Sequence, residues 1–274
     1  MGLRVNTNIA SMNAQRNLGS VSTRLMGNFK RLSSGLRIST ASDDAAGLGI
    51  SERMRSQIRS YGAAQRNAQD GISLVQTAEG ALNEVNSILN RMRELSIQAS
   101  NGTLSNADRA TLDTEYQELI SEIGRIASTS TFNGVQLIDG STTALDLQAG
   151  INSAEVITVS LQDSTATALG LAGLTVGTAA GASAALSVID AAVDLVTTAR
   201  GALGSAQNRL QSAISSIANA SENLAAAESR IRDVDVATET ADLTRNTIMQ
   251  QAAVAMLAQA NVQPQLALSL LQGG

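Results

Sequence analysis

The chain has 274 residues, of which 43% are hydrophobic but only 1% aromatic, and its formal net charge is −5. It contains no cysteine and no histidine, which excludes disulfides, thiol nucleophiles and zinc centres built on those residues. The acidic balance argues against bulk nucleic-acid binding. Composition therefore favours a non-enzymatic protein whose core of small and aliphatic side chains suits closely packed helices.

The first and last parts of the chain carry the same apolar pattern, in which apolar residues recur at steps of three, four or seven. Such steps place side chains along one edge of a helix. Near the N-terminus the pattern comprises Leu18, Val21, Leu25, Phe29, Leu32 and Leu36. Towards the C-terminus it comprises Leu203, Leu210, Ile214, Ile217, Leu224 and Ile231. Long helices are therefore predicted at both ends.

Residues 1–40 are predicted to form the first helix, followed by a break over 39–44. We expect Ser42 or Asp43 to cap the next helix, because an acidic or hydroxyl side chain suits the positive N-terminal end of a helix. The adjacent carboxylates of Asp43 and Asp44 could also suggest acid–base catalysis, which would require a partner group placed around a substrate. Helix capping is the favoured interpretation.

The second predicted helix runs from about Ala45 to Ala99 and would span roughly 80 Å at about 1.5 Å per residue. Its apolar edge comprises Met54, Ile58, Tyr61, Ala68, Ile72, Val75, Leu82, Leu89 and Met92. The pair Asn101-Gly102 is predicted to end this helix, and Ser105 or Asn106 to begin a shorter one.

From about residue 130 the periodicity changes. Asn133-Gly134 and Asp139-Gly140 are turn signals, and residues 145–149 and 157–161 alternate between apolar and polar side chains. We therefore predict a small β-rich excursion over 130–178. Helix is expected again near Ser183, with a break at 233–235 and a last helix over 238–271.

One uncharged stretch, Ala166 to Ile189, is long enough to cross a membrane. It is rich in Gly, Ala, Ser and Thr and poor in large aliphatic residues. A loop that leads into a soluble helix is the favoured interpretation, so no membrane partner is expected.

These elements predict a mainly α fold, in which long paired N- and C-terminal helices form a coiled-coil-like bundle with a small central β-rich excursion. A single pair of such helices would leave apolar surface exposed at the termini, which favours self-assembly. Three regions are predicted: terminal helices (1–42 with 236–274), a long-helix bundle (43–129 with 183–235) and a short solvent-facing region (130–182).

Several motifs resemble those of bacterial flagellin. They are Arg4-Val5-Asn6-Thr7-Asn8, Leu32-Ser33-Ser34-Gly35-Leu36-Arg37-Ile38, Ser42-Asp43-Asp44-Ala45-Ala46-Gly47-Leu48, Arg93-Glu94-Leu95, Phe132-Asn133-Gly134, Ala260-Asn261 and Leu268-Ser269-Leu270-Leu271. They occur in the order of that family and cover roughly residues 1–140 and 185–274. The middle is shorter than in larger flagellins, so no large outer domains are expected.

The resemblance implies a structural subunit that polymerises helically into the extracellular flagellar filament, the propeller for swimming. It implies export of the unfolded chain by the flagellar type III system. The implied partners are other copies of the chain, the flagellar cap and hook-associated proteins, and an export chaperone at the C-terminal helix. No catalytic residue, cofactor, metal or nucleic acid is expected.

The resemblance and the apolar pattern together give two sets of candidate residues. The expected polymerisation contacts are Leu18, Val21, Leu25, Leu32, Met249, Met256 and Leu257. Arg91, Leu95 and Glu115 match positions that the innate immune flagellin receptor binds in flagellins that it recognises. The alternative for the second set is an interface between stacked subunits.

Two other functions stay open at this point. A hook–filament junction protein resembles flagellin at both ends. A secreted stalk-like binding module would use the helices as a spacer and would not form long polymers.

Overall fold

The computed structural model describes the backbone of residues 7–272 and the side chains of residues 7–262. Within that part the chain is mainly helical, as predicted. The elements are α1 (Ile9–Ser34), α2 (Ala45–Ala99), α3 (Asn106–Thr129), β1 (Thr131–Phe132), β2 (Val135–Gln136), β3 (Ala144–Gln148), β4 (Val156–Ser160), α4 (Ala179–Arg232) and α5 (Val236–Gln272).

The chain forms two compact units, which are described separately. The terminal unit comprises residues 1–56 and 223–274, and the central unit comprises residues 57–222. The long helices α2 and α4 contribute to both.

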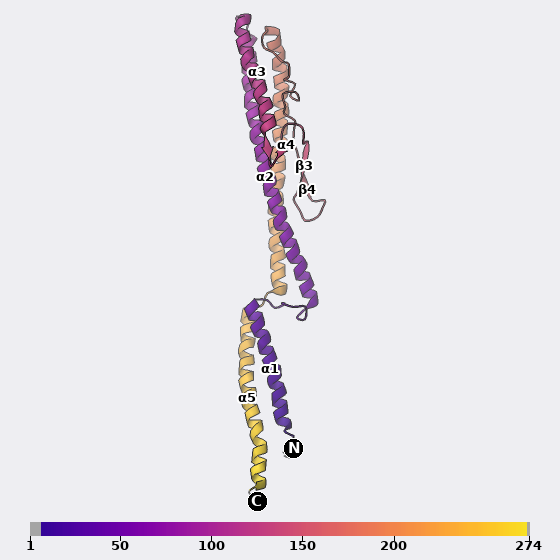
Figure 1. Cartoon of the computed structure of the whole chain (residues 1–274), viewed down its shortest axis with the longest axis vertical. Helices are drawn as coiled ribbons and strands as arrows, with labels where there is room; N and C mark the ends of the chain where they lie inside the picture. The colour runs from indigo at the N-terminus through magenta and orange to yellow at the C-terminus, as the bar shows by residue number, and fades with distance from the viewer. Residues whose placement is uncertain (1–6, 273–274) are drawn as a thin grey trace. The chain divides into compact units, whose positions relative to one another are not determined.

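In the terminal unit α1 and α5 lie side by side and run in opposite directions (Figure 1). At one end of the pair the Asn8 amide donates to the carbonyl of Ala260 at 2.8 Å. At the other end the amide N–H of Arg37 donates to the carbonyl of Arg232 at 2.7 Å. Contacts at both ends therefore define one antiparallel register.

The first helix ends earlier than the predicted residue 40. Gly35 follows Ser34 with φ of +69°, a left-handed conformation that terminates α1 and that glycine adopts without steric cost. The chain then makes an isolated antiparallel bridge between Leu36 and Asp233. The apolar periodicity of the sequence does not predict this end of α1, because Leu36 continues the apolar pattern.

The capping prediction for α2 is wrong by one residue. The side chain of Asp44 caps the helix, since its Oδ1 accepts from the Gly47 N–H at 2.9 Å. Asp43 instead closes the preceding turn: its Oδ2 accepts from the backbone N–H groups of Ser39 and Thr40 at 3.1 and 2.9 Å and from both hydroxyls. These hydrogen bonds, those from Thr40 foremost, hold the pKa of Asp43 well below its usual range.

The central unit packs α2, α3 and α4 around one apolar core. α2 has the predicted bounds, and α3 begins after an N-cap at Ser105, whose side chain and that of Asp108 form a capping box. Large core residues include Leu82, Leu89, Met92, Leu95, Tyr116, Ile123, Ile189, Val196, Leu203 and Leu210. The core is aliphatic and rich in alanine, as the composition predicts.

The predicted β-rich excursion is two separate two-stranded antiparallel sheets. β1 and β2 meet at Asn133-Gly134, both with positive φ, which is the geometry of a tight hairpin turn. β3 pairs with β4, with Leu145 opposite Val159. In β4 the side chains of Ile157 and Val159 are buried in the core of the central unit, so the excursion packs against the helices.

α4 begins at Ala179, four residues before the expected Ser183. By length and composition alone it is also apolar enough to cross a membrane. Its apolar edge, from Ala182 to Ile217, is buried within the protein. Since 28% of the residues in its apolar window are buried, and since this helix is the one that meets the criterion within the described residues, the criterion is weak evidence for a membrane span.

Candidate assembly surface

The contact between α1 and α5 follows a heptad pattern on both helices. On α1 the least exposed positions are Ser11, Ala14, Leu18, Val21, Leu25, Asn28 and Leu32. On α5 they are Glu239, Leu243, Asn246, Gln250, Ala253, Leu257 and Ala260. Alternating steps of three and four residues keep these positions on one edge of each helix. We call this contact the seam.

Most of the residues predicted to make polymerisation contacts lie instead at the seam within one chain. Val21 is 4% exposed and so contacts α5 of its own chain. Leu18, Leu25, Leu32 and Leu257 are half-buried at the same seam. Met249 and Met256 lie off it, 42% and 67% exposed, and are the predicted residues that remain available to another subunit.

Sequence reasoning missed most of the exposed apolar surface of the terminal unit. The apolar pattern of the sequence includes Phe29. In the structure Asn28 occupies the seam position instead, and the side chain of Phe29 is exposed to solvent. Off-seam residues with apolar side chains between 42% and 67% exposed are Ile9, Met12, Met26, Phe29, Val236, Ile248, Met249, Val254, Met256 and Val262. The signal for them is a second apolar edge beside the first, visible in Ile248-Met249 and in Met26 with Phe29.

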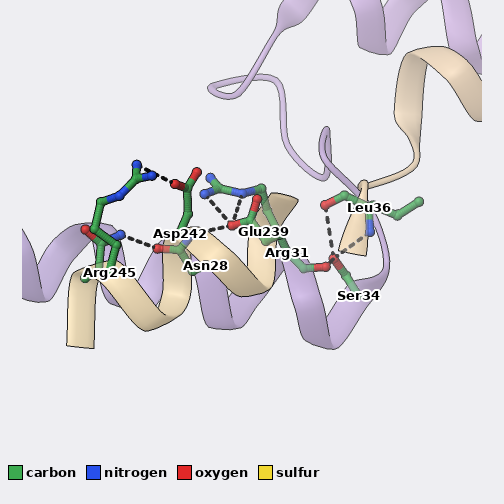
Figure 2. A network of polar contacts seen from close by, with 8 residues as sticks. Asn28, Arg31, Ser34, Leu36, Glu239, Asp242 and Arg245 are labelled. Atoms are coloured by element: carbon green, nitrogen blue, oxygen red, sulfur yellow. Dashed lines mark hydrogen bonds and ion pairs between the residues drawn. The ribbon is translucent and has the colours of Figure 1, made fainter. Parts of the chain in front are cut away.

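The seam contains one buried polar network (Figure 2). The amide of Asn28, which is 2% exposed, donates to Oε1 of Glu239 at 2.5 Å and accepts from the Asn246 amide at 2.8 Å. Arg31 donates to the same Glu239 oxygen through Nη2 at 2.7 Å and Nε at 2.9 Å. Figure 2 shows Asn28, Arg31 and Glu239 converging between α1 and α5, with the pair Asp242–Arg245 beside them.

The network fixes the charge of Glu239. Its pKa is lowered mainly by the hydrogen bond from Arg31, and burial opposes part of that effect. The pKa of Arg31 is raised by the same hydrogen bond. A buried carboxylate with an ion-pair partner and an amide donor is satisfied without water.

The three candidate receptor residues lie together in the central unit, though not equally accessible. Arg91 of α2 makes an exposed ion pair with Glu115 of α3, with Nη2–Oε1 at 2.8 Å, and a second with Glu94 at 3.1 Å. Leu95 lies one helical turn further along α2 and is 1% exposed, in the core. Arg91 and Glu115 can meet a partner in this conformation, whereas Leu95 supports α2 from within.

Nothing in the described part of the chain is arranged for chemistry at a metal. Between residues 7 and 262, no group of three or more His, Cys, Asp or Glu side chains is placed to hold a metal ion. The motif residues Arg4, Val5 and Asn6 and the side chains of Leu268–Leu271 lie outside the described residues, as does the side-chain surface of any chaperone site there.

Comparison with known proteins gives a consistent answer. Residues 5–143 match the family model of the bacterial flagellin N-terminal helical region, and residues 186–271 match that of the C-terminal helical region. A flagellin of Halalkalibacterium halodurans is 50% identical over 270 residues, which cover 98% of this chain and 99% of the relative.

Two further relatives support the match. A flagellin of Bacillus subtilis is 44% identical over 304 residues, covering 98% of this chain and all of the relative. The crystal structure of Bacillus cereus flagellin aligns with 56% of this chain and 88% of its own, with a TM-score of 0.51 and 33% identity.

Proposed function

Because the chain belongs to the bacterial flagellin family, whose members are structural subunits of the extracellular flagellar filament, we propose that its filament contacts include the off-seam apolar residues of α1 and α5. The observation that carries the proposal is their exposure. Met26, Phe29, Ile248 and Met256 are each more than half exposed, although the helices that bear them are packed together.

Such a surface is costly for an isolated chain. Burying apolar area yields about 25 cal/mol per Å², so covering even a few of these side chains in a neighbouring subunit supplies several kcal/mol. A two-helix pair has only one seam and cannot cover both of its sides. A second copy of the same unit, which offers the same kind of surface, is the partner that a helical polymer provides.

The test is seeded elongation of the full chain. In the variant Met26→Gln with Phe29→Gln, added to short wild-type filament fragments, we expect filaments to lengthen at least tenfold more slowly, as seen by electron microscopy. The matched control, Met26→Leu with Phe29→Leu, keeps the surface apolar and should elongate close to the wild-type rate. Equal elongation by both variants, at equal helix content, would overturn the proposal.

The swimming function follows from the polymer. In this proposal the filament transmits motor torque as a propeller, and cells that carry only the Gln variant should swim poorly while the Leu control swims. Type III export, the cap, the hook-associated proteins and an export chaperone at the C-terminal helix stay predictions from the family resemblance. Secretion assays on the same strains test export separately from assembly.

A second proposed function is recognition of the free subunit by the innate immune flagellin receptor. The exposed Arg91–Glu115 pair supports it. We expect Arg91→Ala and Glu115→Ala each to lower receptor signalling in reporter cells while helix content is unchanged. Leu95→Ala should act by destabilising α2, since Leu95 is buried. Full signalling by the two surface variants would contradict this function.

The junction-protein and stalk interpretations predict another outcome. Either would leave the intact chain monomeric or in small bundles while the seeds persist. Identity over nearly the whole length to the two flagellins supports the filament subunit instead.

A further inference from the structure

The amides of buried Asn28 and half-buried Asn246 interrupt a seam that is otherwise built mainly from apolar and small side chains. We propose that this amide pair is a register lock, which selects one alignment of α1 against α5 over alignments shifted by a heptad. The inference concerns the terminal unit of a single chain. It rests on the proposed function only in that this unit carries the assembly surface.

A lock is needed because the rest of the seam repeats. Leu18, Leu25 and Leu32 are spaced by seven residues on α1, and Leu243, Gln250 and Leu257 by the same step on α5. Sliding one helix by a heptad, about 10 Å along the axis, brings seam positions opposite seam positions again, although Gln250 stands where the leucine of α5 would repeat. Apolar contacts of this kind discriminate weakly between the two alignments.

The ion pair repeats as well. Glu239 is held by Arg31 in the observed register. Arg24 lies one heptad before Arg31 and is exposed. In the register in which each α5 residue faces α1 one heptad earlier, Arg24 takes the place of Arg31 beside Glu239. The charge pair alone therefore fits two registers.

The asparagines do not repeat. One heptad before Asn28 stands Val21, and one heptad after Asn246 stands Ala253. In that same shifted register Asn246 would face Val21 and lose its Asn28 partner. In the opposite shift Glu239 would face the end of α1 near Gly35, and Asn28 would lose its acceptor. Each shift leaves at least one buried polar group without its hydrogen-bond partner. The free-energy cost of that loss is how a single polar residue in a coiled-coil seam specifies the alignment.

The hydrogen bonds from Asn8 to Ala260 and from Arg37 to Arg232 also favour the observed register, as does the backbone bridge at Leu36 and Asp233. These contacts lie at the two ends of the helix pair. The experiment therefore has to separate side-chain selection within the seam from these end contacts.

The chain has no cysteine, so introduced cysteine pairs report alignment without background. Ser11→Cys with Asn261→Cys reports the observed register, in which the Ser11 hydroxyl donates to the Asn261 Oδ1 at 2.8 Å. Ser11→Cys with Val254→Cys reports the shifted one, because Val254 lies one heptad before Asn261 on the same edge. Each full-length chain is treated as monomer with a short bifunctional thiol cross-linker.

In the otherwise wild-type chain the first pair should cross-link at least tenfold more than the second. In the variant Asn28→Leu with Asn246→Leu this ratio should fall at least fivefold, while resistance to urea is kept or increased. The matched control, Asn17→Leu with Gln251→Leu, adds the same apolar groups at exposed positions of the two helices and should keep the wild-type ratio.

A second variant tests the lock even if the first fails to fold. Val21→Asn with Asn28→Val moves the α1 asparagine by one heptad and leaves α5 unchanged. Only the shifted register then gives that asparagine both Glu239 and Asn246. The shifted cross-link should rise at least tenfold over wild type.

The proposal is overturned if the wild-type ratio is near one, or if neither the leucine variant nor the moved asparagine changes it. In those cases the end contacts or the leucines set the register. Elongation from seeds is measured in parallel. Wild-type chains that fail to elongate count against the proposed function, while the monomer cross-links still decide the lock.

Discussion

Gly71 of α2 lies directly against Leu147 of β3, with no room between them for a side chain. A methyl group on Gly71 would overlap the Leu147 Cδ1 and lie 3.4 Å from Leu210 of α4. A glycine inside a helix costs about 1 kcal/mol relative to alanine. Here the absence of a side chain at Gly71 leaves the space that Leu147 occupies, and so Gly71 determines where the β3–β4 hairpin packs on α2.

Gly71→Ala is therefore expected to destabilise the central unit by about 1–3 kcal/mol, because overpacking outweighs the gain in helix propensity. The matched control is Gly80→Ala on the same helix, where an added methyl group meets nothing within 4 Å. The control should raise the free energy of unfolding by about 0.5–1 kcal/mol. Urea denaturation followed by circular dichroism measures both; a stabilised Gly71→Ala protein would show that the hairpin moves aside freely.

Arg109→Leu is expected to lower the free energy of unfolding by about 2–4 kcal/mol, since it leaves the buried carbonyl of Ala99 without this donor. The guanidinium, on a residue that is 7% exposed, donates to the carbonyl of Ala99 at 2.8 Å and to that of Asn101 at 2.9 Å, so it closes the end of α2. Arg109→Lys should recover only part of the loss, because an ammonium lacks the planar fork. If Arg109→Lys had the same free energy of unfolding as the wild type, the positive charge of Arg109 would be sufficient and its planar geometry would not matter.

Alkaline pH is expected to weaken the central unit through Tyr116. Burial raises the pKa of its hydroxyl from 10.0 to about 12. The neutral phenol is the form that the folded state favours, so its contribution is fully present below pH 10 and is lost as pH rises from 10 to 12. The loss is about 3 kcal/mol at most. Thermal unfolding of Tyr116→Phe between pH 9 and 12 should lack this component; an equal decline in both proteins would assign it to other groups.

Acid is expected to weaken the terminal unit through Glu239. Its folded pKa lies below the ordinary 4.5, so its stabilising effect is present above pH 4.5 and is lost as pH falls through the lowered value. Glu239→Gln should cost about 1–3 kcal/mol at pH 7, and the difference from wild type should shrink towards pH 3. Hydrogen exchange of the α1 amides reports this unit directly. A constant difference across that range would contradict the assignment.

The sequence predicts elements wherever local signals agree. The bounds of the 55-residue helix α2 follow from an apolar edge from Met54 to Met92, interrupted at Gln65 and Glu79, between an acidic cap and Asn101-Gly102. The hairpin at Asn133-Gly134 follows from turn chemistry. The end of α1 does not follow from the sequence, because the left-handed Gly35 interrupts an apolar pattern that Leu36 continues.

The site was harder to predict than the fold. Periodicity alone cannot distinguish Phe29 outside the seam from Asn28 within it, since the choice depends on Glu239 and Asn246, more than 200 residues away. For the same reason the burial of Leu95 is not evident from its motif. Contacts between distant segments decided both.

The contacts of Asn8 also constrain the order of events during folding. Its partner Ala260 is 252 residues further along the chain. Closing so long a loop from an unfolded chain has a large entropic cost, which grows slowly with length but comes before any contact compensates for it. A central unit that folds first removes most of that cost, because it leaves a much shorter length of free chain to close. We therefore expect the rate of α1–α5 pairing during refolding to depend on the stability of residues 57–222, a segment that includes neither helix.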